Sequence, residues 1–283
     1  MKLSPEAAIE KLLETGIIES AADIKGESGI CLLRDAIWDD NAEALPLLIS
    51  AGVDANSHDD DGWTMLSCAA AHGGDGCIQT LLAAGADVNS KCIDGRSPLM
   101  LACSNGNLST VRLLCKAGAE IDVMAEDGST ALMAASALGQ TDCVKALLKC
   151  GANVGLKDKN GWNALMAACA RGHILCAMAL LSAGADANVN HANNDKRTAL
   201  IHACRAGSID CVNALLAAGA EVNSQDNDGM TALMYTCING HVDCTTALLT
   251  AGADTLLRSK QGKTALDFTK DNGRFACAKA FQV

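Results

Sequence analysis

Cysteine is the residue type whose abundance in this chain could support chemistry. The 283 residues include 15 cysteines and 6 histidines. Clustered thiols and imidazoles can bind zinc, and single thiols can be oxidised. Zinc sites use close pairs such as C-x-x-C, which the sequence lacks; its recurring spacing is C-x6-C, as between Cys169 and Cys176. The spacing therefore indicates no metal site, and we expect no cofactor.

Motifs for catalysis are also absent from the sequence. It contains no Gly-rich phosphate loop, no H-E-x-x-H and no G-x-S-x-G. These motifs would position a phosphate, a zinc-bound water or a nucleophilic serine. The sequence pI of about 4.9 argues against nucleic-acid binding, which needs a basic surface. The excess of basic residues over residues 258–283 is too small to change this. We predict that the protein is not an enzyme and binds no nucleic acid.

A period of 33 residues organises nearly the whole sequence. Glycines that mostly follow Asp or Asn recur at this interval, and a second glycine follows each by 23 residues, usually within Leu-Leu-x-x-Gly-Ala. The first series comprises Gly62, Gly95, Gly128, Gly161, Gly229 and Gly262, with Lys196 in place of one glycine. A fixed period of this length indicates a stacked array of small units.

The sequence pattern of each repeat predicts a tight turn followed by two helices. Asp-Gly or Asn-Gly favours a turn with positive φ at the glycine. A Thr or Ser two residues later, such as Thr64 or Thr231, is placed to cap the first helix. Leu-Leu pairs give the second helix an apolar face, and Gly-Ala ends it. The interval from Gly161 to Lys196 is 35 residues, which predicts an insertion of two residues in the connection 188–195.

The predicted organisation is one repeat array behind a cap. Residues 1–25 match the second helix of a repeat without its first helix, so we assign them as an N-terminal half-repeat cap. The array spans 26–283, with units near 26–58, 59–91, 92–124, 125–157, 158–192, 193–225, 226–258 and 259–283. No apolar run reaches the roughly 18 residues of a membrane span. Residues 1–20 show neither a secretory signal nor a transit peptide, so we expect a cytoplasmic protein, with the nucleus as the alternative location.

The 33-residue pattern resembles that of ankyrin repeats over about residues 26–283. Several offsets recur together, although the family's Thr-Pro-Leu-His motif is reduced to variants such as residues 97–100 (Ser-Pro-Leu-Met) and 130–133 (Thr-Ala-Leu-Met). The resemblance implies a mainly α fold, a solenoid of about eight helix-turn-helix units joined by β-turn fingers. It also implies a concave face of finger tips and first helices that binds protein partners. Methionines are expected to pack where the family has histidine: Met100, Met133, Met166 and Met234.

Most cysteines then have a structural interpretation. Six share one place in the second helix: Cys77, Cys143, Cys176, Cys211, Cys244 and Cys277. Four share one place in the first helix: Cys103, Cys169, Cys204 and Cys237. Equivalent places in adjacent repeats lie about 8–10 Å apart, beyond the Cα separation of about 7 Å that a disulfide tolerates. We predict reduced, buried thiols, with Cys92 and Cys150 as exposed outliers that keep redox sensing open as an alternative.

The partner-facing offsets implied by the resemblance flank the turn glycine and lie nine and ten residues after it. All three tryptophans, Trp38, Trp63 and Trp162, occupy such offsets, and tryptophan is enriched at binding hot spots. Acidic residues surround the first two tryptophans, among them Asp39, Asp60 and Asp61. Residues 1–62 contain four Lys+Arg and fourteen Asp+Glu, a net charge of −10. We predict that this surface binds a basic segment of a partner protein.

A second candidate surface surrounds Trp162. Three arginines fall at inner offsets, and His202 and Tyr235 lie six residues after their turn positions. The arginines are Arg171, Arg197 and Arg205. Because guanidinium groups match carboxylates in geometry and charge, we predict that this surface binds an acidic segment.

The leading functional prediction is a non-enzymatic interaction module, or scaffold, that binds an extended partner segment in its concave groove. One alternative is a permanent structural subunit of a large assembly. Another is regulation by modification, through redox chemistry or asparagine hydroxylation. The resemblance implies hydroxylation sites at the asparagines after Gly-Ala-Asp-Val or its variants: Asn56, Asn89, Asn188 and Asn223.

Overall fold

The computed structural model describes residues 3–184 and 189–281. These residues form seventeen helices and no β-strand, so the predicted mainly α fold is confirmed. Isolated antiparallel bridges, such as His58 with Thr64, occur at the bases of three turns. The chain divides into two compact units, residues 1–131 with 149–152 and residues 132–148 with 153–283, which are described separately.

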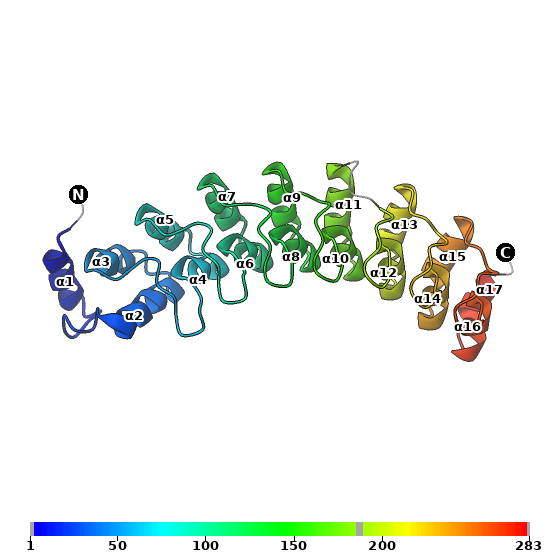
Figure 1. Cartoon of the computed structure of the whole chain (residues 1–283), viewed down its shortest axis with the longest axis horizontal. Coiled ribbons are helices and arrows are strands. Elements are labelled where there is room, and N and C mark those ends of the chain that lie inside the picture. The colour runs from blue at the N-terminus through cyan, green and yellow to red at the C-terminus, as the bar shows by residue number, and fades with distance from the viewer. Residues whose placement is uncertain (1–2, 185–188, 282–283) are drawn as a thin grey trace. The chain divides into compact units, whose positions relative to one another are not determined.

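Helices of the first unit form two rows (Figure 1). One row contains α1, α3, α5 and α7, and the other, which we call the first-helix row, contains α2, α4 and α6; neighbours within each row are in contact. The bounds are α1 Pro5–Glu14, α2 Gly26–Trp38, α3 Ala44–Ser50, α4 Met65–His72, α5 Asp75–Ala83, α6 Pro98–Asn105 and α7 Leu108–Lys116.

Helices of the second unit follow the same alternation. Contacts connect α10, α12, α14 and α16 in its first-helix row, and α11, α13, α15 and α17 in the other row. The bounds are α8 Ala131–Ala137, α9 Thr141–Lys149, α10 Ala164–Ala170, α11 Ile174–Ala183, α12 Ala199–Ala206, α13 Ile209–Ala217, α14 Ala232–Asn239, α15 Val242–Thr250, α16 Ala265–Asp271 and α17 Phe275–Ala280.

The predicted helix caps are present at the first helices. In α4, the hydroxyl of Thr64 accepts the backbone N–H of Ser67 at 3.1 Å. Ser97, Thr198, Thr231 and Thr264 cap α6, α12, α14 and α16 in the same way. In the repeat of Trp162 the residue at this place is Asn163, whose side-chain oxygen accepts the N–H of Met166 at 2.9 Å. A cap of this type contributes about 1 kcal/mol to helix stability.

Turns between repeats require a left-handed backbone at one residue. Each glycine of the 33-residue series has positive φ, between 71° at Gly229 and 83° at Gly128. Lys196 occupies the same place with φ of 61°. The side chain of lysine makes this conformation unfavourable, so the turn before α12 carries strain that the other turns avoid.

Side chains of asparagine brace consecutive fingers. The Oδ1 of Asn56 accepts the N–H of Asp87 at 2.9 Å, and Asn223 accepts the N–H of Asp254 in the same way. Both asparagines lie six residues before a turn glycine. These bonds cross from one repeat to the next, so they fix the spacing of the fingers.

The insertion does not lengthen the finger that precedes α12. Asn190 lies six residues before Lys196 and accepts the N–H of Glu221 at 2.7 Å, the role that Asn56 has in its own repeat. The finger therefore has the ordinary length. In the register of the sequence, the two additional residues therefore precede Asn190, at the beginning of the predicted connection 188–195 or before it. Asn188 lies outside the described residues.

The core depends on residues that face the next repeat. The leucine four residues after each turn position is at most 3% exposed: Leu66, Leu99, Leu132, Leu165, Leu200 and Leu233. The four methionines predicted to pack in place of histidine are buried as well, between 0% for Met166 and 6% for Met133. In the last repeat, Leu266 is half-buried.

Replacing Lys196 with glycine should stabilise the protein. A non-glycine residue in the left-handed region costs about 1–3 kcal/mol, and the greater freedom of glycine in the unfolded chain offsets about 0.4–1 kcal/mol of this. The middle of the range that these two effects leave is a gain of roughly 1 kcal/mol in the free energy of unfolding, which we expect for Lys196→Gly in urea titrations.

Gly262→Ala is the converse variant. A Cβ at Gly262 would meet no atom within 4 Å, so only the φ of 75° opposes the substitution. We expect a loss of about 1–2 kcal/mol. If Gly262→Ala destabilises the protein but Lys196→Gly does not stabilise it, the turn at Lys196 is not strained.

Candidate functional site

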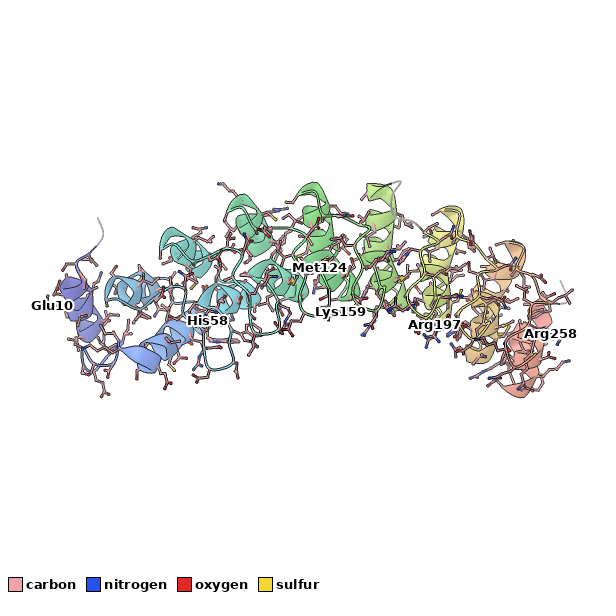
Figure 2. The ribbon with its side chains drawn as sticks, viewed as in Figure 1. Glu10, His58, Met124, Lys159, Arg197 and Arg258 are labelled. Carbon is pink, nitrogen blue, oxygen red and sulfur yellow. The ribbon has the colours of Figure 1, made fainter. Side chains whose placement is uncertain are left out.

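The fingers and the first helices of each unit form one surface, which we call the inner face. Its residues come from the turn positions and from the carboxyl ends of the first-helix row. Lys159 and Arg197 belong to two of its fingers (Figure 2). Most of the predicted site residues of each unit lie at these places, whereas His202 and Tyr235 lie in the middle of α12 and α14.

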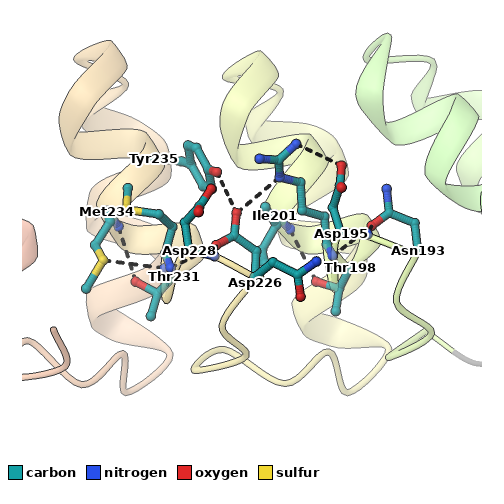
Figure 3. Close-up of polar contacts among 12 residues, drawn as sticks. Asn193, Asp195, Thr198, Ile201, Asp226, Asp228, Thr231, Met234 and Tyr235 are labelled. Carbon is teal, nitrogen blue, oxygen red and sulfur yellow. Dashed lines mark hydrogen bonds and ion pairs between the residues drawn. The ribbon is translucent and has the colours of Figure 1, made fainter. Parts of the chain in front are cut away.

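A buried carboxylate organises the inner face of the second unit. Asp226 is 5% exposed and precedes Gly229 by three residues. Its Oδ1 accepts the N–H groups of Asp228 and Met230, both at 2.9 Å. Its Oδ2 accepts the hydroxyl of Tyr235 at 2.6 Å and Nε of Arg197 at 3.1 Å (Figure 3). One carboxylate therefore closes its own turn and joins two predicted site residues from neighbouring repeats.

Protonation within this cluster is set by the same contacts. Burial alone would raise the pKa of Asp226, but hydrogen bonds from Tyr235, Met230 and Arg197 outweigh it and hold the pKa below its usual value. Burial and the hydrogen bond to Asp226 raise the pKa of Tyr235. At neutral pH the cluster thus contains a carboxylate, a neutral phenol and a guanidinium group, which is a fully charge-assisted network.

Two guanidinium groups contact the ring of Tyr235. The Cζ atoms of Arg205 and Arg197 lie 5.3 Å and 5.9 Å from its centroid. Arg197 also pairs with Asp195 at 3.2 Å. Arg205 and Arg171 are exposed, and neither makes an ion pair among the described residues. Their positive charges are therefore available to an external group.

Trp162 stacks against a buried histidine. The centroids of Trp162 and His202 lie 4.1 Å apart with a tilt of 40°. His202 is 4% exposed, and its Nε2 has no hydrogen-bond partner among the residues that the structure describes. Burial, together with the charges of Arg205 and Arg197, lowers the pKa of His202 to about 4. The ring is therefore neutral at physiological pH and presents an apolar surface to Trp162.

In the first unit, Trp38 offers the largest accessible aromatic surface of the predicted site. It ends α2, is 55% exposed, and contacts the ring of His72 at 5.6 Å with an interplanar angle of 64°. Asp39 follows as the C-terminal cap residue of α2 and is exposed. A half-exposed indole beside an exposed carboxylate is typical of a binding surface.

Trp63 lies on the next finger and is half-buried. The Oδ1 of Asp59 accepts the N–H groups of Asp61 and Trp63 at 3.1 Å and 2.8 Å. The Cζ of Arg96 lies 5.4 Å from the ring of Trp63. Asp60 and Asp61 are exposed at the finger tip. Among the described residues no ring contact joins Trp63 to Trp38, so the structure does not bring the two indoles together.

Asp226 and Arg96 are the two residues that sequence reasoning missed. A signal existed for Asp226, because Asp59, Asp158 and Asn193 occupy the same place three residues before the turn position. The side chains of all four accept backbone N–H groups of their own turns. Arg96 directly follows Gly95, the offset of Trp63 in the previous repeat. That offset marks both as partner-facing, and Arg96 makes the surface around Trp63 less acidic than predicted.

None of the described cysteines forms a disulfide, and most of them are buried. The prediction that Cys92 is exposed was wrong: it is 4% exposed, because its finger position is the one that Asp59 occupies beneath the turn. Cys150 is exposed. Burial and a hydrogen bond with Cys150 raise the pKa of Cys115 to about 12, so its thiol is a weak nucleophile.

Metal ligands and membrane spans have no candidates in the part of the chain that the structure describes. No group of three or more His, Cys, Asp or Glu side chains there could hold a metal ion. Within the same residues, every helix is too short or too polar to span a membrane.

The pKa of His202 predicts a pH dependence of stability. The folded value of about 4 lies below the unfolded value of about 6.5, so neutral His202 contributes stability that is complete above pH 6.5. This stability falls as the pH drops toward 4. We expect His202→Phe, which keeps a ring against Trp162, to lose less stability than the wild type between these values in urea titrations.

At pH 7 His202→Phe should be at least as stable as the wild type, because it removes a buried nitrogen without a hydrogen bond, a defect of about 1–3 kcal/mol. If the free energies of unfolding of the two proteins fall in parallel between pH 6.5 and 4, His202 is not a neutral side chain with a lowered pKa.

Comparisons with known proteins identify the family. The family model of ankyrin repeats in three copies matches residues 7–92, 33–125, 71–158, 132–226 and 218–281. The crystal structure of the human ASB11 ankyrin repeat domain is similar, with 30% sequence identity, a TM-score of 0.69, and coverage of 77% of this chain and 96% of that chain. No curated protein sequence matches. Ankyrin repeats are generally protein–protein interaction modules. The predicted ankyrin-repeat solenoid is thus confirmed, and the chain belongs to the ankyrin repeat family.

Proposed function

We propose that this protein is a non-enzymatic interaction module whose inner face binds extended segments of partner proteins. The observation that carries the proposal is the pair of exposed guanidinium groups, Arg171 and Arg205, without acidic partners among the described residues. Arg205 lies over the ring of Tyr235, which Asp226 holds in place, and Arg171 ends the first helix of the preceding repeat. A partner carboxylate would find guanidinium groups with donors unused, and Trp162 and Tyr235 would supply apolar contact area.

The first unit supports a partner of opposite charge. Trp38 is 55% exposed, and Asp39, Asp60 and Asp61 are exposed carboxylates. Exposed carboxylates of this kind attract lysine or arginine side chains of a partner. We infer that a basic segment binds here and an acidic segment binds on the second unit, with charge steering the encounter and the aromatic residues providing most of the affinity.

Catalysis gains no support from the same residues. His202 is neutral and inaccessible, and its ring contact is with Trp162 rather than with a nucleophile. The thiols nearest the inner face, such as Cys68, have a pKa raised by burial and by Asp59, to about 12 in that case. Thiols in that state are protonated and unreactive at neutral pH.

Charge reversal on the inner face should remove the partner of the second unit. We expect Arg171→Glu with Arg205→Glu to lose proteins that the wild type captures from a native cell lysate, with affinity for a purified partner lowered at least about tenfold. Binding of the wild type should weaken with salt. Captured proteins would be identified by mass spectrometry.

The matched control is Lys145→Glu with Lys279→Glu, which makes the same change in charge at exposed residues of α9 and α17. It should capture the wild-type set. The same comparison with Trp38→Ala and Trp63→Ala tests the first unit. If the inner-face variants and the control capture the same proteins as the wild type, the inner face is not the binding surface and the proposal fails.

A further inference from the structure

The end of the first unit beside α2 has an uncovered helix face. In the first-helix row, α4 packs against α2 and α6 packs against α4. The chain supplies α1 as a neighbour for α3 in the other row. Residues 15–25, which connect α1 to α2, are turns and bends rather than a helix. In the row of α3, α5 and α7, α1 therefore covers the end. In the first-helix row, no helix of the described residues precedes α2.

Equivalent residues show that this face of α2 is normally an interface. The residue three places after the turn position is buried in later repeats, with Met65 at 0% and Ala164 at 2% exposed. In α2 this residue is Leu32, which is only half-buried. Six places after the turn position the later residues are buried, as Cys68 is at 2% exposure, or half-buried, as Ala167 is, whereas Asp35 is exposed. The difference arises because the later residues are covered by the preceding first helix.

The connection covers only the beginning of α2. The carbonyl group of Ile24, just before α2, lies against Gly29 and leaves no room for a Cβ there. Beyond it lies an open hollow of about 470 Å³, lined by Ile17, Ile18, Cys31 and Leu32. Its floor is thus apolar, at the place where the repeat before would pack.

Carboxylates form the rim of this hollow. Glu19, Asp23, Glu27 and Asp35 all line it, and no lysine or arginine of the described chain does. The backbone N–H groups of Glu19 and Ser20 donate hydrogen bonds to Oδ2 of Asp23. Arg34 forms an ion pair with Asp35 at 3.6 Å on the exposed surface. Glu19 and Glu27 make no ion pair with any described residue. An occupant with positive charges on both sides of an apolar stripe would complement the hollow.

We propose that this hollow receives a basic amphipathic helix of a partner protein, which takes the place of the missing first helix. The helix would bury Leu32 and Ile17, both half-buried, with small apolar residues at i and i+4 or i+7, as first helices do within the array. Lysine or arginine beside this stripe would meet Glu19, Glu27 and Asp35. The surface is separate from the inner face, so the proposal does not depend on the function proposed above.

Cys31 provides a local reporter of occupancy. It lines the hollow and is half-buried, whereas Cys150 is exposed elsewhere on the unit. The probe is a stapled 20-residue helix of about six turns, with leucine and alanine on one face and lysine beside them. A second probe carries glutamate in place of lysine. Bound probe should slow alkylation of Cys31 several-fold and leave Cys150 unchanged, with both sites read by peptide mass spectrometry.

Charge reversal at the rim completes the test. Fluorescence anisotropy should show the lysine probe binding the wild type, at least about tenfold weaker binding to Glu27→Lys with Asp35→Lys, and little binding of the glutamate probe. The matched control, Glu10→Lys with Glu14→Lys, alters exposed residues of α1 that do not line the hollow and should bind like the wild type; Glu10 is labelled in Figure 2.

Three results would overturn the proposal. They are unprotected Cys31 at saturating lysine probe, equal binding of the two probes, and equal weakening by the rim and control variants. A fourth such result would come from sedimentation of the protein alone. If the protein self-associates and Glu27→Lys with Asp35→Lys abolishes the self-association, the hollow binds a second copy of this chain and not a basic partner helix.

Discussion

Burial of each repeat by its neighbours is the constraint on which the rest of this structure depends. A single pair of short helices cannot enclose an apolar core, so every pair relies on the pairs beside it. The leucines that face the next repeat show this directly, since all but the last are at most 3% exposed, while Leu266 is half-buried. The same constraint explains the half-buried Leu32 of α2. Exposure in this fold therefore reports position in the stack as much as residue type.

Stacking also forces the fingers to perform two tasks at once. In the second unit, Oδ1 of Asp226 closes its own turn, and Oδ2 of the same residue fixes Tyr235 and Arg197. Removing this carboxylate would loosen the turn and the inner face together, so a loss of binding could not be attributed to either. Arg171 and Arg205 do not have this double role, because they lie exposed at the ends of first helices. Charge reversal there separates recognition from folding.

The repeat pattern predicted the fold well because its signals are local. Asp-Gly turns, Thr and Ser caps and Leu-Leu stripes each act within a few residues, and the family comparison and the helices confirm them. The position of the insertion was predicted less closely, for the opposite reason. Asn188 and Asn190 both fit the pattern locally, and only the hydrogen bond of Asn190 to Glu221 in the next repeat distinguishes them. Cys92 was misjudged in the same way, because its burial depends on the finger beneath which it lies.

Pairing across repeats was also the part of the candidate site that spacing could not provide. Offsets placed Trp63 and Tyr235 on the inner face, but Arg96 and Asp226 lie at offsets where the residue type differs from repeat to repeat. The sequence register gives a residue's place in its own unit, whereas side-chain partners depend on the rotamers of two units. Only the folded structure shows such contacts, and Arg96 over Trp63 makes this surface less acidic than the sequence predicted.

The distribution of aromatic residues connects the core to recognition. Adjacent first helices approach closely through small residues such as Ala69, Ala102 and Ala203, each 0% exposed, and such an interface has no room for an indole. All three tryptophans and the single tyrosine lie instead on the inner face, where only part of each ring is needed for packing. Trp38 retains 55% of its exposure, and contacts such as Arg96 over Trp63 contribute only about 0.5–1 kcal/mol at a solvent-exposed site. Because the core excludes these rings and their intramolecular contacts are weak, their apolar area remains available for a partner to bury.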